Sequence, residues 1–320
     1  MAEFTLQEII DATSGTCKGD VSLQFKDIST DTRTIEAGYV FVALKGDTFD
    51  GHDFIKTAIE KGATAAIVEK GRSVDGIICV EVENTLKAYQ DLANFHRRRF
   101  QIPVVAITGS SGKTTTKEMV AAVLSTEFNV LKTEKNFNNE IGLPKTLLQL
   151  SPEHEACVVE MGMRGLGQIE ELALIAEPTI GIITNVGTSH IELLGSQEAI
   201  AEAKGELIRC LGPDSVAILN EDDHFVKAMS SIAKGKTVTY GIHSNATVIG
   251  SHLRYKKDGI KFTCKCYDEV FDVFLPMIGE HNVYDALAAI AAGRVLGVKS
   301  SKIKKGLSDF TGTPMRQEIV

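Results

Sequence analysis

Short, predominantly apolar segments recur along the chain, separated by stretches in which apolar residues have helical spacing. The apolar segments are typical of strands buried in a parallel sheet, and the spacing between them is typical of amphipathic helices. From residue 102 we expect strands at 104–107, near 130, and at 156–161, 179–184 and 215–219, with helices at 113–125, 169–176 and 197–211. Repeated strand and helix units predict a mostly parallel sheet with helices on both faces.

The first 83 residues show the same rhythm on a smaller scale. We expect a helix near 5–13, a strand at 40–44, a helix at 52–61 and a strand at 65–68. This order predicts a small α/β domain. Residues 84–100 then form a connecting helix with a basic last turn, which complements the helix dipole, so we favour solvent exposure of that turn over a phosphate site.

The last part of the chain changes pattern. Alternating polar and apolar residues near 253–255, 260–266 and 269–275 predict antiparallel strands, and two helices follow at 283–296 and 300–310. The expected organisation is an α/β fold, with domains over 1–83 and 102–313, the connecting helix at 84–101 between them, and the start of a further domain at 314–320.

Composition limits the class of protein. With 320 residues, 43% apolar residues, 24% charged residues and a net charge of -8, the chain is typical of a globular protein without a general basic surface. Nucleic acid and acidic membranes are therefore not expected partners. The sequence has no signal-peptide pattern and no long apolar run, so we expect a cytoplasmic location, no membrane insertion and six reduced structural cysteines.

The segment V-V-A-I-T-G-S-S-G-K-T-T-T at 104–116 predicts a strand, a phosphate-binding turn and a helix. Glycines let backbone N–H groups approach a polyphosphate, Lys113 supplies a positive charge, and Thr114 supplies a hydroxyl for magnesium. Ile107 stands where the general phosphate-loop pattern has its first glycine, so the motif is a variant.

Other polar groups follow predicted strands. Glu160 ends one strand in the place where phosphate-loop proteins often carry a magnesium-binding carboxylate, and His190 lies just past another. In the first domain, T-D-T-R at 30–33 and the segment 44–55 also follow strands, where solvated turns and a ligand site are equally compatible with the pattern. The polar group at 138–144 is compatible with a loop and helix start, and Asn282 with a helix cap.

Together these segments resemble the Mur ligase family of ATP-dependent amide-forming enzymes, and the resemblance covers essentially all 320 residues. Its marks are T-D-T-R, F-V-A-L-K-G-D-T-F-D-G-H-D-F, T-G-S-S-G-K-T-T-T-K-E-M, N-F-N-N-E-I-G-L-P, E-M-G, T-N-V-G-T-S-H-I-E, A-K-G-E and G-E-H-N-V. The N-N-E-I-G-L-P form is the most discriminating, and it implies the branch that joins D-alanyl-D-alanine to UDP-N-acetylmuramoyl-tripeptide.

The resemblance also implies roles for individual residues. ATP would be held by Gly109, Ser110, Ser111, Gly112, Lys113, Thr114, Thr115, Asn282 and Arg316. Asn138 and Asn139 would lie near the transferring phosphate. Two magnesium ions would be held by Thr114, Glu160, His190 and Lys204, with Lys204 carbamylated. The UDP end of the precursor would contact Thr30, Asp31, Arg33, Lys45 and Gly46.

Family chemistry implies an acyl phosphate intermediate in a three-domain enzyme, and we expect a monomer. We therefore expect a ligase whose third domain lies beyond residue 320 and which is inactive without it. A non-catalytic module that binds nucleotide and UDP-precursor is an alternative, as is another amide ligase of the same family. A GTPase is disfavoured because the sequence lacks the base-reading N-K-x-D motif.

Overall fold

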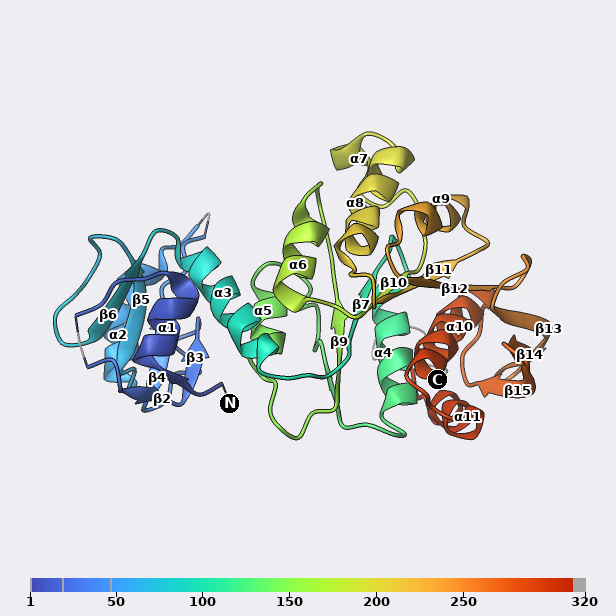
Figure 1. Cartoon of the computed structure of the whole chain (residues 1–320), viewed down its shortest axis with the longest axis horizontal. Helices are drawn as coiled ribbons and strands as arrows, with labels where there is room; N and C mark the ends of the chain where they lie inside the picture. Colours follow the sequence, from blue (N-terminus) through green and yellow to red (C-terminus); the bar gives the residue numbers. More distant parts are fainter. Residues whose placement is uncertain (1, 19, 47, 313–320) are drawn as a thin grey trace. The chain divides into compact units, whose positions relative to one another are not determined.

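The structure is a computed structural model that describes residues 2–18, 20–46 and 48–312. The chain forms two compact units. Unit 1 comprises residues 1–101 and 144–152, and unit 2 comprises residues 102–143 and 153–320 (Figure 1). The predicted start of a further domain at 314–320, with Arg316, lies outside the described residues. No helix among the described residues is long and apolar enough to span a bilayer.

Unit 1 is a small α/β unit, as predicted. Its parallel sheet has the order β3-β4-β5-β6, and β1 pairs with β2 in a separate antiparallel ribbon. The elements are β1 (Phe4–Thr5), α1 (Leu6–Thr13), β2 (Gln24–Phe25), β3 (Asp27–Ser29), β4 (Tyr39–Val42), η1 (Gly51–Phe54), α2 (Ile55–Glu60), β5 (Ala65–Glu69), β6 (Ile78–Val82) and α3 (Thr85–Arg98). The expected connecting helix, α3, packs against α1 and β5 within this unit.

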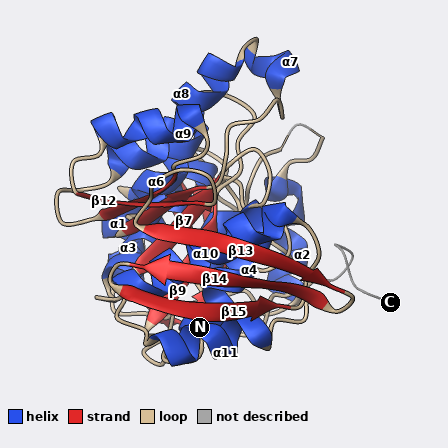
Figure 2. Cartoon of the chain, turned by 90° about the vertical axis from the view of Figure 1, so that its right-hand side faces the viewer, coloured by secondary structure: helices blue, strands red, loops and turns tan. Residues whose placement is uncertain are grey.

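Unit 2 contains a nine-stranded sheet with the order β15-β14-β13-β12-β11-β10-β7-β9-β8. Its strands are β7 (Val104–Thr108), β8 (Val130–Lys132), β9 (Ala156–Glu160), β10 (Ile180–Ile183), β11 (Val216–Asn220), β12 (Lys236–Gly241), β13 (Val248–Lys256), β14 (Gly259–Cys266) and β15 (Glu269–Leu275). The strands from β8 to β13 are parallel, whereas β14 runs antiparallel to both β13 and β15. Figure 2 shows these last three strands as a ribbon at one edge of the sheet. The predicted parallel sheet with an antiparallel extension is confirmed.

Helices cover both faces of this sheet. They are α4 (Lys113–Leu124), α6 (Gln168–Ala176), α7 (Ile191–Leu194), α8 (Gln197–Cys210), α9 (His224–Ala228), η2 (Met229–Ile232), α10 (Glu280–Val295) and α11 (Ser300–Ser308), while α5 (Gly142–Leu147) begins in unit 2 and continues into unit 1. α4 packs against α10 and α11, and these form one group of helices. α6 packs against α8, and these two form another (Figure 1).

The core of unit 2 brings small residues together on the face that carries α4 and α10. Most residues of α10 from Ala286 to Gly293 are fully buried. A Cβ atom at Gly293 would lie 2.7 Å from Cγ1 of Val123 on α4, so a glycine is needed for the two helices to pack this closely. The position of α10 relative to the loop before α4 therefore follows from close packing in the core.

Three local predictions differ from the structure. The basic last turn of α3 was expected to face solvent, but His96 and Arg97 are buried because they bond to the carbonyl oxygens of Leu150 and Phe100. α10 begins at Glu280, before the predicted start at 283, so Asn282 lies inside its first turn and Gly279 is the N-cap residue. Strand β12 was not predicted, although its sequence K-T-V-T-Y-G alternates and its apolar residues Val238 and Tyr240 are buried. A short strand with polar residues at every other position is easily taken for a loop.

Candidate functional site

The carboxyl ends of four neighbouring parallel strands meet at one edge of the unit 2 sheet. β7 lies between β9 and β10, and β11 follows β10. In this register Ile107 pairs with Glu160, and Thr108 pairs with Ile183. The loop that follows β7, the carboxylate that ends β9 and the segment that follows β10 therefore lie side by side, as predicted for a ligand site in an open α/β sheet.

The loop at 109–112 leads from β7 directly into α4, which places the N-terminus of a helix at this edge. Its two glycines make room for other parts of the protein. A Cβ atom at Gly109 would lie 1.7 Å from Oγ1 of Thr184, and one at Gly112 would lie 2.6 Å from Oδ1 of Asp285. Gly112 also has a φ of +78°, in the left-handed region that favours glycine. N–H groups at such a helix terminus attract anions.

Cationic side chains gather around this loop. Nζ of Lys113 donates to the carbonyl oxygens of Gly109 at 2.8 Å and Ser110 at 3.3 Å. Lys204 on α8 is only 1% exposed, and burial together with the nearby charge of Lys113 lowers its pKa to about 7. Burial and the charge of Lys113 therefore both disfavour the protonated form of Lys204.

His190 adds a third basic group. It is the N-cap residue of α7 and has a φ of +67°. Partial burial and then the charges of Lys204, Lys113 and Arg164 lower its pKa. The mutual effects place Lys113, Lys204 and His190 within electrostatic reach of one another. Several basic groups close together attract a polyanion such as a polyphosphate.

Glu160 ends β9 at this edge of the sheet, and it is 3% exposed. Its Oε1 accepts a hydrogen bond of 2.8 Å from Nδ2 of Asn138, whereas Oε2 is buried and has no hydrogen-bond partner among the residues that the structure describes. A buried carboxylate oxygen without a partner is unfavourable unless a cation or donor binds it. The donor set of Glu160 and Thr114, both oxygen ligands, therefore fits a magnesium ion.

No group of three or more His, Cys, Asp or Glu residues is arranged to hold a metal within the part of the chain that the structure describes. A magnesium ion here would have to complete its coordination with oxygens from a phosphate or from water, which is its usual behaviour in nucleotide sites.

Asn138 and Asn139 were expected together near a transferring phosphate, but their contacts differ. Asn138 contacts Glu160, and its carbonyl accepts from the N–H of Gly162 at 2.8 Å. Oδ1 of Asn139 instead accepts from the N–H of Gly142 at 2.9 Å, where α5 begins. The helix-start explanation for this segment therefore applies to Asn139, and Asn138 is the one connected to the carboxylate.

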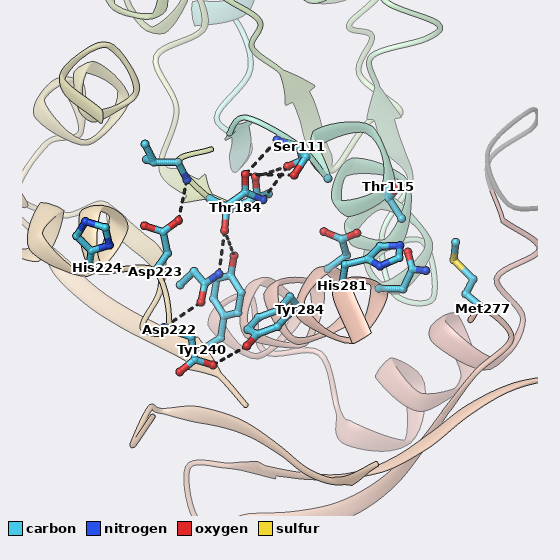
Figure 3. A pocket seen from close by; sticks show the side chains of 16 residues that line it. Ser111, Thr115, Thr184, Asp222, Asp223, His224, Tyr240, Met277, His281 and Tyr284 are labelled. Carbon is cyan, nitrogen blue, oxygen red and sulfur yellow. Dashed lines mark hydrogen bonds between the residues drawn. The ribbon is translucent and has the colours of Figure 1, made fainter. Parts of the chain in front are cut away.

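A pocket of about 600 Å³ opens beside the loop. Figure 3 shows its lining side chains, which come from the loop, from the ends of β10, β11 and β12, and from α10. The lining residues are Ser111, Gly112, Thr115, Thr184, Asn185, Val186, Asn220, Asp222, Asp223, His224, Tyr240, Met277, His281, Asn282, Tyr284 and Asp285. Its size is in the range of small-molecule sites.

Sequence reasoning missed much of this lining. The run N-E-D-D-H at 220–224 follows β11 at the same edge of the sheet, so the reasoning applied to His190 would have found it. Burial opposes ionisation of Asp222, but hydrogen bonds to Oδ2 from the N–H groups of Ile242 and His243 and from the Tyr284 hydroxyl contribute to a pKa of about 2.

Four lining residues lie on α10, and Asn282 and Asp285 are the two that are buried. Asn282 is 2% exposed, and its Nδ2 donates to the carbonyl of Ile278 at 2.7 Å. Oδ1 of Asp285 accepts from the hydroxyl of Thr116 at 2.7 Å, which ties α10 to the first turn of α4. Asn282 was predicted to contact a nucleotide base, and its place in the lining is compatible with that prediction.

The candidate precursor residues all belong to unit 1. Thr30, Asp31 and Arg33 follow β3, and Lys45 and Gly46 follow the neighbouring parallel strand β4. The guanidinium of Arg33 is paired with Asp31, with 2.7 Å between Nη2 and Oδ2, and this pairing lowers the pKa of Asp31 to about 2. The Arg33 side chain is 86% exposed, so it remains accessible to a ligand.

Comparisons with known proteins cover nearly the whole chain. Residues 107–293 match the Mur ligase middle domain, and residues 24–109 match the model described as Mur ligase family, catalytic domain. UDP-N-acetylmuramoyl-tripeptide--D-alanyl-D-alanine ligase from Synechocystis is 48% identical over 89% of this chain and 62% of its own length. The enzyme of the same name from Bacillus subtilis is 38% identical over 100% of this chain and 70% of its length.

Solved structures agree with these relatives. MurF from Acinetobacter baumannii has a TM-score of 0.92 and 35% identity, covering 98% of this chain and 69% of its own. MurF ligase from Thermotoga maritima in complex with ADP has a TM-score of 0.83 and 30% identity, covering 90% of this chain and 67% of its own. The chain thus spans 62 to 70% of the length of these proteins.

Proposed function

The chain belongs to the Mur ligase family, and we propose that it carries the nucleotide and UDP-precursor sites of a ligase that joins D-alanyl-D-alanine to UDP-N-acetylmuramoyl-tripeptide. One observation carries this proposal. Lys113 follows the loop that opens α4 and lies within electrostatic reach of Lys204 and His190, and Glu160 at the same sheet edge has a buried carboxylate oxygen without a partner among the described residues. This arrangement suits a polyphosphate and its magnesium ion.

We assign ATP to the pocket beside the loop. The triphosphate lies against the N-terminus of α4 with Lys113, and the base lies toward Asn282 on α10. The loop residues predicted to hold the phosphates, from Gly109 to Thr115, all belong to this edge of the sheet. The ADP-bound relative from Thermotoga maritima makes a nucleotide the natural choice of ligand.

Thr114 and Glu160 would hold one magnesium ion, which when bound offsets the negative charge of the phosphates. The unpartnered Oε2 of Glu160 supports this assignment. Asn138 holds the other carboxylate oxygen, so it orients Glu160 toward the loop. We therefore assign Asn138 the role of orienting Glu160, the residue that binds the metal.

We assign a second magnesium site to His190 and to Lys204 in its carbamylated form. A buried lysine beside another lysine is a poor place for a positive charge, and its pKa of about 7 leaves much of the amine neutral at physiological pH. A neutral amine can add carbon dioxide and release a proton, which turns the side chain into an anionic oxygen ligand. The carbamate would balance the charge of Lys113 and of a bound metal.

The proposed reaction has two steps. A carboxylate oxygen of the UDP-linked tripeptide forms a bond to the terminal phosphorus of ATP, and ADP leaves. The amine of D-alanyl-D-alanine then attacks the carbonyl carbon of this acyl phosphate, which expels phosphate and forms the amide after loss of a proton. The contribution of Lys113 is to stabilise the charge on the transferring phosphoryl group.

In unit 1 we assign the UDP end of the precursor to Thr30, Asp31, Arg33, Lys45 and Gly46. They follow two adjacent strands, so their backbones lie at one edge of the smaller sheet. A cytoplasmic location and a monomeric state are further parts of the proposal, in keeping with a small, soluble, nucleotide-linked substrate.

The test is release of ADP by the purified chain and by the same chain within its full reading frame. For the chain within its full reading frame we expect ADP release that depends on both UDP-N-acetylmuramoyl-tripeptide and D-alanyl-D-alanine, together with formation of the UDP-linked pentapeptide, detected by mass spectrometry, whereas the chain alone should bind ATP without turnover. Absence of ATP binding by either protein would overturn the assignment of the pocket. Binding of ATP and UDP-tripeptide by both proteins without any turnover would instead favour the alternative of a non-catalytic binding module.

A further inference from the structure

Ser111, in the middle of the loop, is held by the segment that follows β10. Its backbone N–H and its hydroxyl both donate to Oδ1 of Asn185, at 3.1 and 3.2 Å. Its carbonyl oxygen accepts from the Thr184 hydroxyl at 2.6 Å and from Nδ2 of Asn185 at 3.2 Å. Every polar atom of Ser111 therefore bonds to Thr184 or Asn185. Figure 3 shows Ser111 beside Thr184, with dashed lines for the hydrogen bonds.

The preceding residue is held in the same way. The N–H of Ser110 donates to the carbonyl oxygen of Asn185 at 3.0 Å, and the Ser110 hydroxyl accepts from the N–H of Gly187 at 2.8 Å. Gly109 then passes so close to Thr184 that no side chain would fit between them. The loop is thus attached to the end of β10 over three consecutive residues.

We propose that Asn185 is a positioning residue that clamps Ser110 and Ser111 against β10, so that the phosphates of the nucleotide are bound by N–H groups from Gly112 onward. This inference rests on the proposed nucleotide site and goes beyond it, because it divides the loop into a part held by protein and a part that faces ligand. Neither the family match nor the motif makes this division.

The chemistry explains why an asparagine serves here. Because the N–H of Ser111 is a donor, the side-chain atom facing it must be the oxygen of the amide. The amide nitrogen then faces the Ser111 carbonyl, where a donor is needed. Aspartate has no donor for that carbonyl, and alanine has neither group. Only an amide of this length supplies both from a single side chain.

The division has a consequence for the ligand. The amides of Ser110 and Ser111 already have acceptors within the protein. The N-cap residue and the first residues of an α-helix have N–H groups without an acceptor within the helix, and here these include Gly112, Thr114 and Thr115. The N–H groups of Gly112, Thr114 and Thr115 are the ones we assign to phosphate oxygens.

The variant Asn185→Ala tests the clamp, and Thr179→Ala is its matched control. Thr179 Oγ1 accepts from the N–H of Val104 at 3.1 Å, so this control removes a hydrogen bond between the same two strands at the end away from the loop. Asn185→Asp is a second variant, with nearly the same shape but without the donor. We measure hydrogen exchange of single amides by NMR without nucleotide, and then ATP affinity by calorimetry.

Without nucleotide, we expect the Ser111 amide to exchange at least about tenfold faster in Asn185→Ala than in the wild type, which corresponds to the loss of about one hydrogen bond. We expect ATP affinity to fall about tenfold in Asn185→Ala and at least as far in Asn185→Asp, with Thr179→Ala close to the wild type. When ATP binds, the amides of Gly112, Thr114 and Thr115 should gain protection, whereas those of Ser110 and Ser111 should change little.

Unchanged exchange in Asn185→Ala would overturn the clamp, as would an equal loss of ATP affinity in Thr179→Ala. A large gain of protection at Ser110 and Ser111 on ATP binding would overturn the division of the loop. Failure of the wild-type chain to bind ATP would count against the proposed function alone, because the exchange measurement without nucleotide still tests the clamp.

Discussion

The carboxylate of Asp285 on α10 accepts a hydrogen bond from the hydroxyl of Thr116 in α4, with 2.7 Å between Oδ1 and Oγ1. Both residues are buried. Burial raises the pKa of Asp285 to about 7, and the hydrogen bond from Thr116 only partly opposes this effect. An aspartic acid that favours its protonated form thus lies between two helices of the core, beside the loop.

This relationship predicts a pH-dependent stability. Between about pH 4 and pH 7 the folded chain keeps a proton that the unfolded chain has released, so the free energy of unfolding falls as pH rises through this window, by up to about 4 kcal/mol. Asp285→Asn should remove this dependence and stabilise the protein at pH 8. Urea unfolding at pH 5 and pH 8 measures the pH dependence of the free energy of unfolding and the stabilisation at pH 8. Asp309→Asn, at an exposed position, is the control. Equal pH slopes for wild type and Asp285→Asn would contradict the prediction.

Removal of the Lys113 side chain should weaken ATP binding by about 10- to 100-fold, because a charge-assisted contact to phosphate is lost. It should also raise the pKa of Lys204, since Lys113 is one of the two causes that lower it. Calorimetry with ATP measures the first effect. Lys302→Ala, at a partly exposed ion pair with Glu127, is the control. Normal acyl phosphate formation by Lys113→Ala would refute its assigned role.

Lys204→Ala should abolish or strongly reduce the ligase reaction, because the proposed anionic ligand disappears. If the lysine acts as a carbamate, short carboxylates such as formate or acetate should restore part of the activity by occupying the space. The measurement is ADP release against carboxylate concentration, with Lys113→Ala as the variant that carboxylates should not rescue. Activity that stays absent at all carboxylate concentrations would weaken the carbamate proposal.

In unit 1, His96 predicts a loss of stability toward acid. Burial lowers its pKa to about 4, the charge of Arg99 adds to this effect, and the hydrogen bond between Nε2 and the Leu150 carbonyl, at 2.9 Å, opposes it. The unfolded chain binds a proton below about pH 6.5 that the folded chain resists down to about pH 4. The free energy of unfolding should therefore fall as pH decreases through this window, by up to about 3 kcal/mol.

The variant His96→Gln isolates this effect, because glutamine keeps a donor for Leu150 but does not titrate in this range. Denaturant unfolding at pH 7 and pH 4.5 should give a smaller difference for His96→Gln than for the wild type. The same difference in both proteins would mean that other groups cause the acid sensitivity.

Local patterns were enough to predict most of the larger elements of unit 2, although not strand β12. Apolar segments in unit 2 and the loop before Lys113 identify strands, turn and helix because their signals lie within a few residues of one another. The parallel sheet follows from their repetition, and the strand-end rule places Glu160 and His190 at one edge. The same rule, applied to the residues after β11, would have added Asp222 and His224.

Other features depend on contacts between residues far apart in the chain. A side chain at position 109 would collide with the Thr184 hydroxyl, 75 positions away in sequence, and one at position 112 would collide with the carboxylate of Asp285. The sequence around Lys204 is typical of a surface lysine, whereas in the structure this side chain is buried near Lys113. Asn138 and Asn139 are adjacent in sequence, yet only one reaches Glu160.

By itself, the sequence determined the kind of protein, the sheet and the position of the glycine-rich loop before α4, because these follow from short-range periodicity and from glycine, lysine and threonine at fixed spacing. Only the tertiary structure decided which loop groups remain available to a ligand. That depends on Asn185 and Asp285 occupying space and hydrogen-bonding groups around the loop, and such long-range steric and polar pairing leaves no periodic signal in one chain.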